Sequence, residues 1–192
     1  MNVEEAIRTR RSIGKVKEDP VPRELVERVI EAAVWAPNHH HTEPWKFVVL
    51  IGEGRSRLGR AYAEIVAETM AGPEHTDEER EQRRLREEAK ARRAPVVIAP
   101  VRVPSASPKA IAEEDRAAVH AAVQNLLLAA HESGLGAVWR TGDQLNHPAV
   151  KRELGLGDAE EVVGFVYIGY PDMTAPAGRR TPGTEKTVWL EA

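Results

Sequence analysis

The sequence has no cysteine among its 192 residues and no large excess of charge of either sign. Without cysteine the protein cannot form a disulfide, use a thiolate nucleophile or hold an iron–sulfur cluster through thiolates. Its 27 basic and 30 acidic residues give a formal net charge of −3. Because a general nucleic-acid-binding domain normally carries a large positive excess, we expect no nucleic-acid partner.

Long hydrophobic runs are also missing. No apolar stretch approaches the roughly 20 residues that a membrane-spanning helix needs, and residues 1–11 lack the apolar core of a signal peptide. We therefore expect a cytoplasmic protein with no membrane partner. With 42% hydrophobic residues, the chain is long enough for one substantial core and short for two, so we expect a single domain over residues 1–192.

The periodicity of the apolar residues predicts the main elements. Helical spacing predicts helices over residues 2–11, 23–35, 52–72, 112–133 and 147–154. Runs rich in β-branched and aromatic residues predict strands over residues 45–51, 95–103, 137–141 and 162–170. Residues 187–190 are a candidate edge strand. This order predicts an α+β fold, with a mixed sheet of few strands wrapped by helices.

Two predicted helical segments have opposite characters. Residues 73–93 are dense in charge, with Leu85 their only large apolar residue. Such a segment is typical of a solvated helix with ion pairs along its surface, and a mobile cap over a site is the alternative. Residues 112–133 are instead apolar on nearly every side in the middle, which is typical of a helix buried in a core or in a subunit interface.

The connection over residues 36–45 combines two prolines, three histidines, a carboxylate and an indole between a predicted helix and a predicted strand. Loops of this kind often carry functional sites. Adjacent histidines rarely converge on one ion, so we expect no metal at His39–His41, although a metal hydrolase using this loop is an alternative. On an extended segment, alternation would point His40 away from its two neighbours.

Two further clusters could bind an anion or a nucleotide. Arg10, Arg11 and Ser12 supply two guanidinium groups and a hydroxyl, which suit a phosphate. Arg140 and Thr141 offer a similar set of donors at the end of a predicted strand. The glycines at positions 52 and 54 do not complete a dinucleotide-binding fingerprint, because the third glycine is replaced by Arg57.

Four motifs occur together and in a fixed order. Residues 10–12 read RRS, and residues 36–45 read AP, six residues, then PW. Residues 134–142 form a glycine-rich strand that ends in Trp-Arg-Thr, and residues 163–171 contain the pattern GxxxxGxP. In these motifs the chain resembles the flavin-dependent nitroreductase family, in its small, minimal-length branch.

The resemblance implies a homodimer with FMN at the subunit interface. It further implies that NADH or NADPH reduces FMN and that a small nitro or quinone-type acceptor then takes the electrons, in alternating (ping-pong) steps. The phosphate and ribityl end would be held by Arg10, Arg11 and Ser12. The flavin would be approached from the partner subunit by Trp35, Asn38 and His39. The remaining phosphate and ring contacts would come from Trp139, Arg140 and Thr141.

Because a flavin carries its own redox chemistry, the protein need supply only binding, orientation and electrostatics, and we expect no catalytic acid or base. Two positions depart from the family pattern. Glu43 stands where glutamine is usual, and Trp35 stands where a basic residue is common. The main alternative is a flavoprotein of the same fold with another task, such as flavin fragmentation or reductive dehalogenation.

Overall fold

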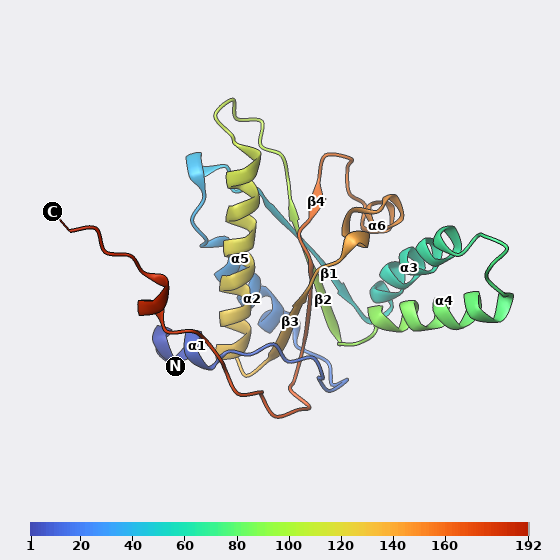
Figure 1. Cartoon of the computed structure of the whole chain (residues 1–192), viewed down its shortest axis with the longest axis horizontal. Coiled ribbons are helices and arrows are strands. Elements are labelled where there is room, and N and C mark those ends of the chain that lie inside the picture. Colours follow the sequence, from blue (N-terminus) through green and yellow to red (C-terminus); the bar gives the residue numbers. More distant parts are fainter. Residues whose placement is uncertain (192) are drawn as a thin grey trace.

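The chain forms a five-stranded sheet with helices on both faces in the computed structural model, which describes residues 1–191. The helices are α1 (Val3–Thr9), α2 (Arg23–Val34), α3 (Arg55–Thr69), α4 (Asp77–Ala91), α5 (Ala112–Glu132) and α6 (Pro148–Leu154). The strands are β1 (Trp45–Ile51), β2 (Val96–Arg102), β3 (Gly136–Arg140), β4 (Glu161–Val162) and β5 (Phe165–Gly169). Helices α1, α2 and α5 lie on one face of the sheet, and α3, α4 and α6 lie on the other (Figure 1).

The strand order is β1-β2-β5-β3, with β4 pairing with β2 beyond the end of β5. The α+β class is confirmed, but the mixed sheet is corrected in one respect. Each pair of strands within residues 1–191 is antiparallel, and the parallel element is an isolated bridge between Ser12 and Ala137. The N-terminal segment therefore runs alongside β3 at the edge of the sheet.

Strand β2 lies between the two halves of the core, and all seven of its residues are buried. Its side chains alternate between the faces. Val96 and Ile98 pack with α2 and α5, while Val97, Ala99 and Val101 pack with α3 and α6. This burial on both faces explains why β2 is apolar from Val96 to Val101, and Arg102 at its end pairs with Glu161 at 2.9 Å.

The strand predicted over residues 162–170 is broken into β4 and β5, for two physical reasons. Pro100 on β2 has no N–H to donate at the break, and its carbonyl instead accepts a hydrogen bond from Val163 N, at 3.0 Å. Gly164 adopts φ +156°, and a Cβ there would stand 1.9 Å from Nε1 of Trp139. The chain must therefore turn at Gly164 to leave room for an indole ring from β3.

Helix α4 has the form expected of a solvated helix. Thr76 and Glu79 form a capping box at its start. Ion pairs three or four residues apart follow, such as Arg80 with Asp77 at 2.9 Å and Arg83 with Glu87 at 3.2 Å. Helix α4 packs against α3, so its inner side is not free. Within residues 1–191, no helix has both the length and the apolar character needed to cross a membrane.

The C-terminal tail differs from the sequence prediction. Residues 187–190 form no strand, and Val188, Trp189 and Leu190 are 83%, 79% and 94% exposed. The tail leaves the body of the protein beyond α1 and does not reach a sheet edge of its own chain (Figure 1). Its three apolar side chains are therefore left in solvent by the single chain.

Candidate functional site

The segment over residues 10–14, which we call the track, connects the predicted cluster at Arg10 with the predicted cluster at Arg140. Ile13 N donates to the carbonyl of Ala137 at 2.9 Å, next to the bridge between Ser12 and Ala137. Further along, Nη2 of Arg140 lies 3.8 Å from the place where a Cβ on Gly14 would stand. Arg10 and Arg140 thus lie near the two ends of a segment that spans at most roughly 14 Å.

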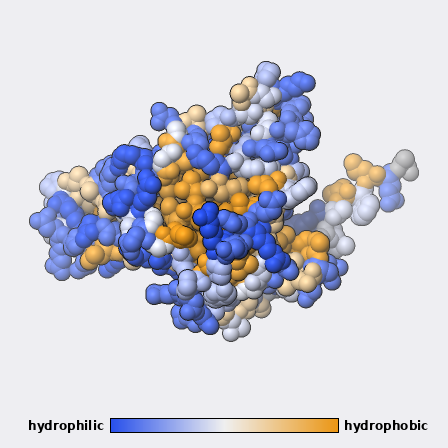
Figure 2. Space-filling view, turned by 180° about the vertical axis from the view of Figure 1, so that it is seen from behind, coloured by the Kyte–Doolittle hydropathy of each residue, from blue (hydrophilic) through white to orange (hydrophobic). Residues whose placement is uncertain are grey.

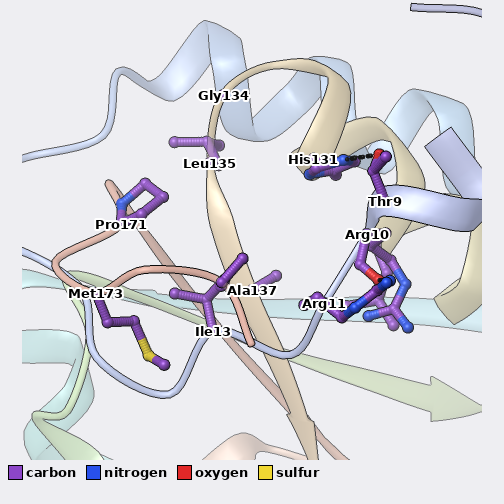
Figure 3. A pocket seen from close by; sticks show the side chains of 12 residues that line it. Thr9, Arg10, Arg11, Ile13, His131, Gly134, Leu135, Ala137, Pro171 and Met173 are labelled. Carbon is purple, nitrogen blue, oxygen red and sulfur yellow. Dashed lines mark hydrogen bonds between the residues drawn. The ribbon is translucent and has the colours of Figure 1, made fainter. Parts of the chain in front are cut away.

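Arg10 carries a charge that its own chain does not neutralise. Its side chain lines a cavity of about 240 Å³ beside Arg11, on the same side as His131, with Pro171 and Met173 across from them (Figure 3). Burial lowers the pKa of Arg10, and the nearby charges of Arg11 and Arg180 lower it further. No acidic side chain within residues 1–191 pairs with it. A half-buried guanidinium among other cations is a natural place for a phosphate.

Arg11 is chemically identical to Arg10 but is differently engaged. Its Nη1 donates to the carbonyls of Arg8 and Arg10, at 2.7 Å each, and its Nε donates to the carbonyl of Pro176 at 3.1 Å. These carbonyls lie at the end of α1 and in the C-terminal tail. Arg11 therefore stabilises a helix end and ties the tail to it, while Arg10 remains available.

Arg180 was missed by the sequence analysis. Arg180 follows Pro176 in the C-terminal tail and lies close enough to Arg10 for its charge to lower the pKa of Arg10. The signal in the sequence was the pair Arg179-Arg180 after the last strand, but only the contact with Arg11 brings this pair to the cluster. The cationic cluster therefore consists of Arg10, Arg11 and Arg180.

The predicted residues on β3 point in different directions. Trp139 is half-buried, donates from Nε1 to the carbonyl of Val163 at 3.2 Å, and has its ring 5.5 Å from that of His120 on α5. Arg140 points to the opposite face and lies 5.9 Å from the centre of the Tyr167 ring. Thr141 follows it and is exposed.

The loop with three histidines is not extended, so the predicted alternation of its side chains is wrong. His39–His41 form a short 3-10 turn. The rings of His39 and His40 stack, with their centres 3.8 Å apart, because His40 takes a left-handed conformation with φ 56°. His41 and Glu43 also have positive φ, at 50° and 41°. Such conformations cost on the order of 1–3 kcal/mol each and persist only where the surroundings enforce them.

Side chains at the N-terminal end of helix α5 hold the histidine loop in this strained conformation. Oγ1 of Thr42 donates to Oδ1 of Asp115 at 2.7 Å, and Asp115 is only 4% exposed. His39 contacts the carboxylate of Glu114 through Nδ1. Within the loop, Glu43 N donates to Oδ1 of Asn38 at 3.0 Å. Asp115 carries no distinguishing signal in the sequence, because an acidic residue in the first turn of a helix is ordinary.

Trp35 and the loop lie on the outside of the chain. The indole of Trp35 is 80% exposed and donates from Nε1 to Glu31 at 3.2 Å. The loop is attached to the start of α5, whereas Thr9, next to Arg10, bonds to His131 near the end of α5 at 2.8 Å. Glu114 and His131 are about 25 Å apart along the helix, at about 1.5 Å per residue. The structure therefore keeps the Arg10 cluster and the histidine loop apart within one chain.

The histidines do not form a metal cluster with other ligands. Among residues 1–191, no three side chains of histidine, cysteine, aspartate or glutamate converge as a group that could hold an ion. His39 and Thr42 are instead bonded to side chains of α5, and these bonds hold the loop as a strained turn.

Most of the chain is similar in sequence to known proteins of one family. The model of the nitroreductase family matches residues 7–170. YfhC of Bacillus subtilis (strain 168), provisionally named an NAD(P)H nitroreductase, is 34% identical over 177 residues, which cover 92% of this chain and 88% of YfhC.

Two solved structures share the fold along the whole chain. A nitroreductase-like family protein from Bacillus cereus has a TM-score of 0.83 and 34% identity, with 100% of this chain and 97% of that chain covered. A protein from Desulfovibrio desulfuricans, provisionally named a nitroreductase and crystallised in complex with FMN, has a TM-score of 0.74 and 27% identity. The match covers 100% of this chain and 98% of that one.

Proposed function

The chain belongs to the nitroreductase family, and on that premise we propose that it carries electrons from NAD(P)H to nitro or quinone-type acceptors. It is an FMN-dependent oxidoreductase with NAD(P)H as its reductant. The acceptor class and an alternating (ping-pong) order, in which the nicotinamide leaves before the acceptor enters, are part of the proposal. The observation that carries it is the uncompensated cationic cluster around Arg10, which lies beside the track leading to Arg140.

The residues present fit FMN. Its phosphate needs charge-assisted donors, which Arg10 and Arg180 supply without competition from a carboxylate of this chain. Ser12 is exposed on the same track and adds a hydroxyl for the ribityl end. The track leads to Arg140 and Thr141, which offer a guanidinium and a hydroxyl for the polar edge of a flavin ring.

The separation of the Arg10 cluster from the histidine loop supports a shared site. His39 contacts Glu114, about 25 Å along α5 from His131 beside the Arg10 cluster, so it does not reach a phosphate held there by the same chain. A second copy brings its own histidine loop within reach, because that loop points outward. We therefore propose a homodimer with FMN at the interface.

The surface supports the same proposal. The outer side of α5 carries Ala117, His120 and Gln124, which are exposed and mostly small or polar, so that another helix can approach it closely. Figure 2, which views the molecule from behind, shows an apolar area in the middle that is partly covered by a polar cluster and lies beside the polar α3–α4 hairpin. Contiguous apolar areas of this kind mark interaction surfaces on soluble proteins.

The protein's part in the reaction is binding and orientation. Bound FMN would supply the redox chemistry that links NAD(P)H to the acceptor. Arg10, Arg180 and Ser12 would hold the phosphate end, and Arg140 with Thr141 would fix the ring end. Trp35 and His39 of a second copy would cover the ring and limit the access of water.

A spectrum of the purified protein followed by anaerobic titration tests the proposal. We expect the yellow absorbance of bound FMN, its bleaching by NADH or NADPH, and its return when a nitroarene or a quinone is added. Steady-state rates at several acceptor concentrations should give parallel double-reciprocal lines, as an alternating order requires. A colourless protein with bound zinc would instead support the metal hydrolase. Bound flavin that neither nicotinamide reduces would support a different task on the same fold.

A further inference from the structure

A second cavity, of about 320 Å³, lies on the other side of β3 from Trp139. Helix α3, the end of α4, the end of β3 and β5 enclose it. The side chains that give it its character are those of Tyr62, Lys90, Arg93, Arg140, Thr141 and Tyr167. It is separate from the cavity beside Arg10, which none of these side chains lines.

The charged side chains that line this second cavity are all positive, and the nearest acid is Glu87, whose charge helps to raise the pKa of Tyr62. No aspartate or glutamate lines it. Lys90 is paired with Glu87, which stands behind it on α4. Arg93 and Arg140, in contrast, make no ion pair or hydrogen bond through their side chains within residues 1–191, and the Arg140 guanidinium lies 5.9 Å from the centre of the Tyr167 ring. Two guanidinium groups thus face one small cavity with their donors unused.

The two phenols add neutral donors to these cations. Tyr62 and Tyr167 are each 4% exposed, and burial raises the pKa of both hydroxyls. Both hydroxyls therefore remain protonated at neutral pH. The Tyr62 hydroxyl donates to that of Tyr167, which leaves the hydroxyls of Tyr167 and Thr141 as neutral donors for a ligand. A cavity with several donors, two unpaired cations and no acid is complementary to an oxyanion, and its volume is at the small end of ligand pockets.

We infer that this cavity, named the oxyanion cavity, binds a carboxylate or phosphate of one of the enzyme's two substrates while the substrate reacts. The inference rests on the proposed function, because Arg140 is shared between the oxyanion cavity and the ring end of the proposed FMN track. In the proposed function, the FMN phosphate is held at the other end of residues 10–14, by Arg10 and Arg180. The second anion must therefore belong to an acidic acceptor or to NADPH, whose extra phosphate NADH lacks.

Substitution of Arg93 tests the inference in FMN-loaded protein. The variant Arg93→Gln removes one unpaired charge and keeps a polar side chain. Arg92→Gln is the matched control, because the neighbouring Arg92 is bound elsewhere, to Glu53 at 3.1 Å and to Ser56 at 2.7 Å. In the acceptor arm, kcat/KM is compared for para-nitrobenzoate and for its neutral amide. In the nucleotide arm, kcat/KM is compared for NADPH and NADH.

We expect Arg93→Gln to reduce one of these two preferences by about tenfold, and Arg92→Gln to leave both unchanged. A loss in the acceptor arm assigns the cavity to a carboxylate, and a loss in the nucleotide arm assigns it to the phosphate. If Arg93→Gln changes neither preference, or if Arg92→Gln has the same effect, the inference is wrong.

Calorimetry with benzoate and with inorganic phosphate gives a readout that does not depend on turnover. We expect the wild type to bind at least one of these anions, and Arg93→Gln to bind it about tenfold more weakly than Arg92→Gln does. Equal binding by the two variants would overturn the oxyanion cavity even if the flavin is reduced normally. Flavin that is not reduced, together with selective loss of anion binding in Arg93→Gln, would overturn the proposed function instead.

Discussion

The two ends of helix α5 differ in how they hold functional side chains. Near its C-terminal end, His131 bonds to Thr9, and Arg10 is left among other cations with no acid to pair with. At its N-terminal end, Asp115 and Glu114 hold a loop with three residues at positive φ. The C-terminal end therefore lies beside positive charge that has no acidic partner, and the N-terminal end holds a loop with a strained backbone.

This difference shows what each end still requires. Unbalanced positive charge is relieved by an anion, so the end with Arg10 needs a ligand. Backbone strain is not relieved by a ligand but is maintained by the groups that enforce it, so the loop is already in its working shape. Because about 25 Å of helix separates them, a flavin that uses both ends must take one from each of two chains.

The oligomeric state is the most severe test of this comparison. We expect a dimer by sedimentation at micromolar concentration, since a shared site of this kind belongs to an obligate interface of roughly 2,000 Å² or more. A monomer with FMN bound would contradict the proposed shared site, in which the loop comes from the second chain.

Substitution of Arg10 should have the largest effect among single variants. Arg10→Ala removes a charge-assisted partner of the phosphate, and we expect FMN affinity to fall by at least about tenfold. Arg11→Ala is the control, since Arg11 already donates to three carbonyls of the chain. We expect it to lower the free energy of unfolding by about 1–3 kcal/mol and to weaken FMN binding less. Flavin fluorescence titration and urea unfolding measure the two effects. Equal FMN affinities in the two variants would remove the distinction between Arg10 and Arg11.

The anchoring of the loop can be broken without touching a histidine. Thr42→Val keeps the shape of the side chain but leaves the buried carboxylate of Asp115 without its hydroxyl donor. We expect the free energy of unfolding to fall by about 1.5–3 kcal/mol, with weaker FMN binding to the dimer. Thr42→Ser keeps the donor and should stay within about 1 kcal/mol of the wild type. If valine and serine behave alike in urea unfolding, the hydrogen bond does not hold the loop.

The smallest effect should separate two neighbouring histidines. His39→Ala removes the side chain that we propose to face the flavin, and we expect FMN binding to weaken by a few-fold, about 0.5–1.5 kcal/mol. His40→Gly accommodates φ 56° without strain, so we expect FMN affinity to stay nearly the same. Titration of both variants with FMN is sufficient, and a larger loss in His40→Gly than in His39→Ala would reverse their roles.

The sequence was sufficient for the parts of the fold that depend on local pattern. Strand β1 has the predicted bounds, and β2 and α5 differ from theirs by about one residue. The break at Gly164 was not predictable, because it depends on the indole of Trp139, which comes from another strand. The absence of a strand over residues 187–190 has the same origin, since edge pairing requires an edge within reach of the tail.

The candidate site was predictable to a similar degree. The clusters around Arg10 and Arg140 were recognised as residue types, but the sequence cannot distinguish the free guanidinium of Arg10 from the engaged one of Arg11. Arg180 joins the cluster only because the tail folds back on Arg11. The alternation expected at His40 failed because three residues in this loop take left-handed conformations, which anchors on α5 enforce.

The outward direction of the His39 loop has a genetic consequence. In a shared-site dimer, a chain that lacks Arg10 can still lend its loop, and a chain that lacks His39 can still lend its phosphate cluster. A mixed pair of these two defective chains has one site with both lesions and one site with neither. Two alleles that are each impaired alone would therefore complement one another when expressed together, as lesions within a single self-contained site would not.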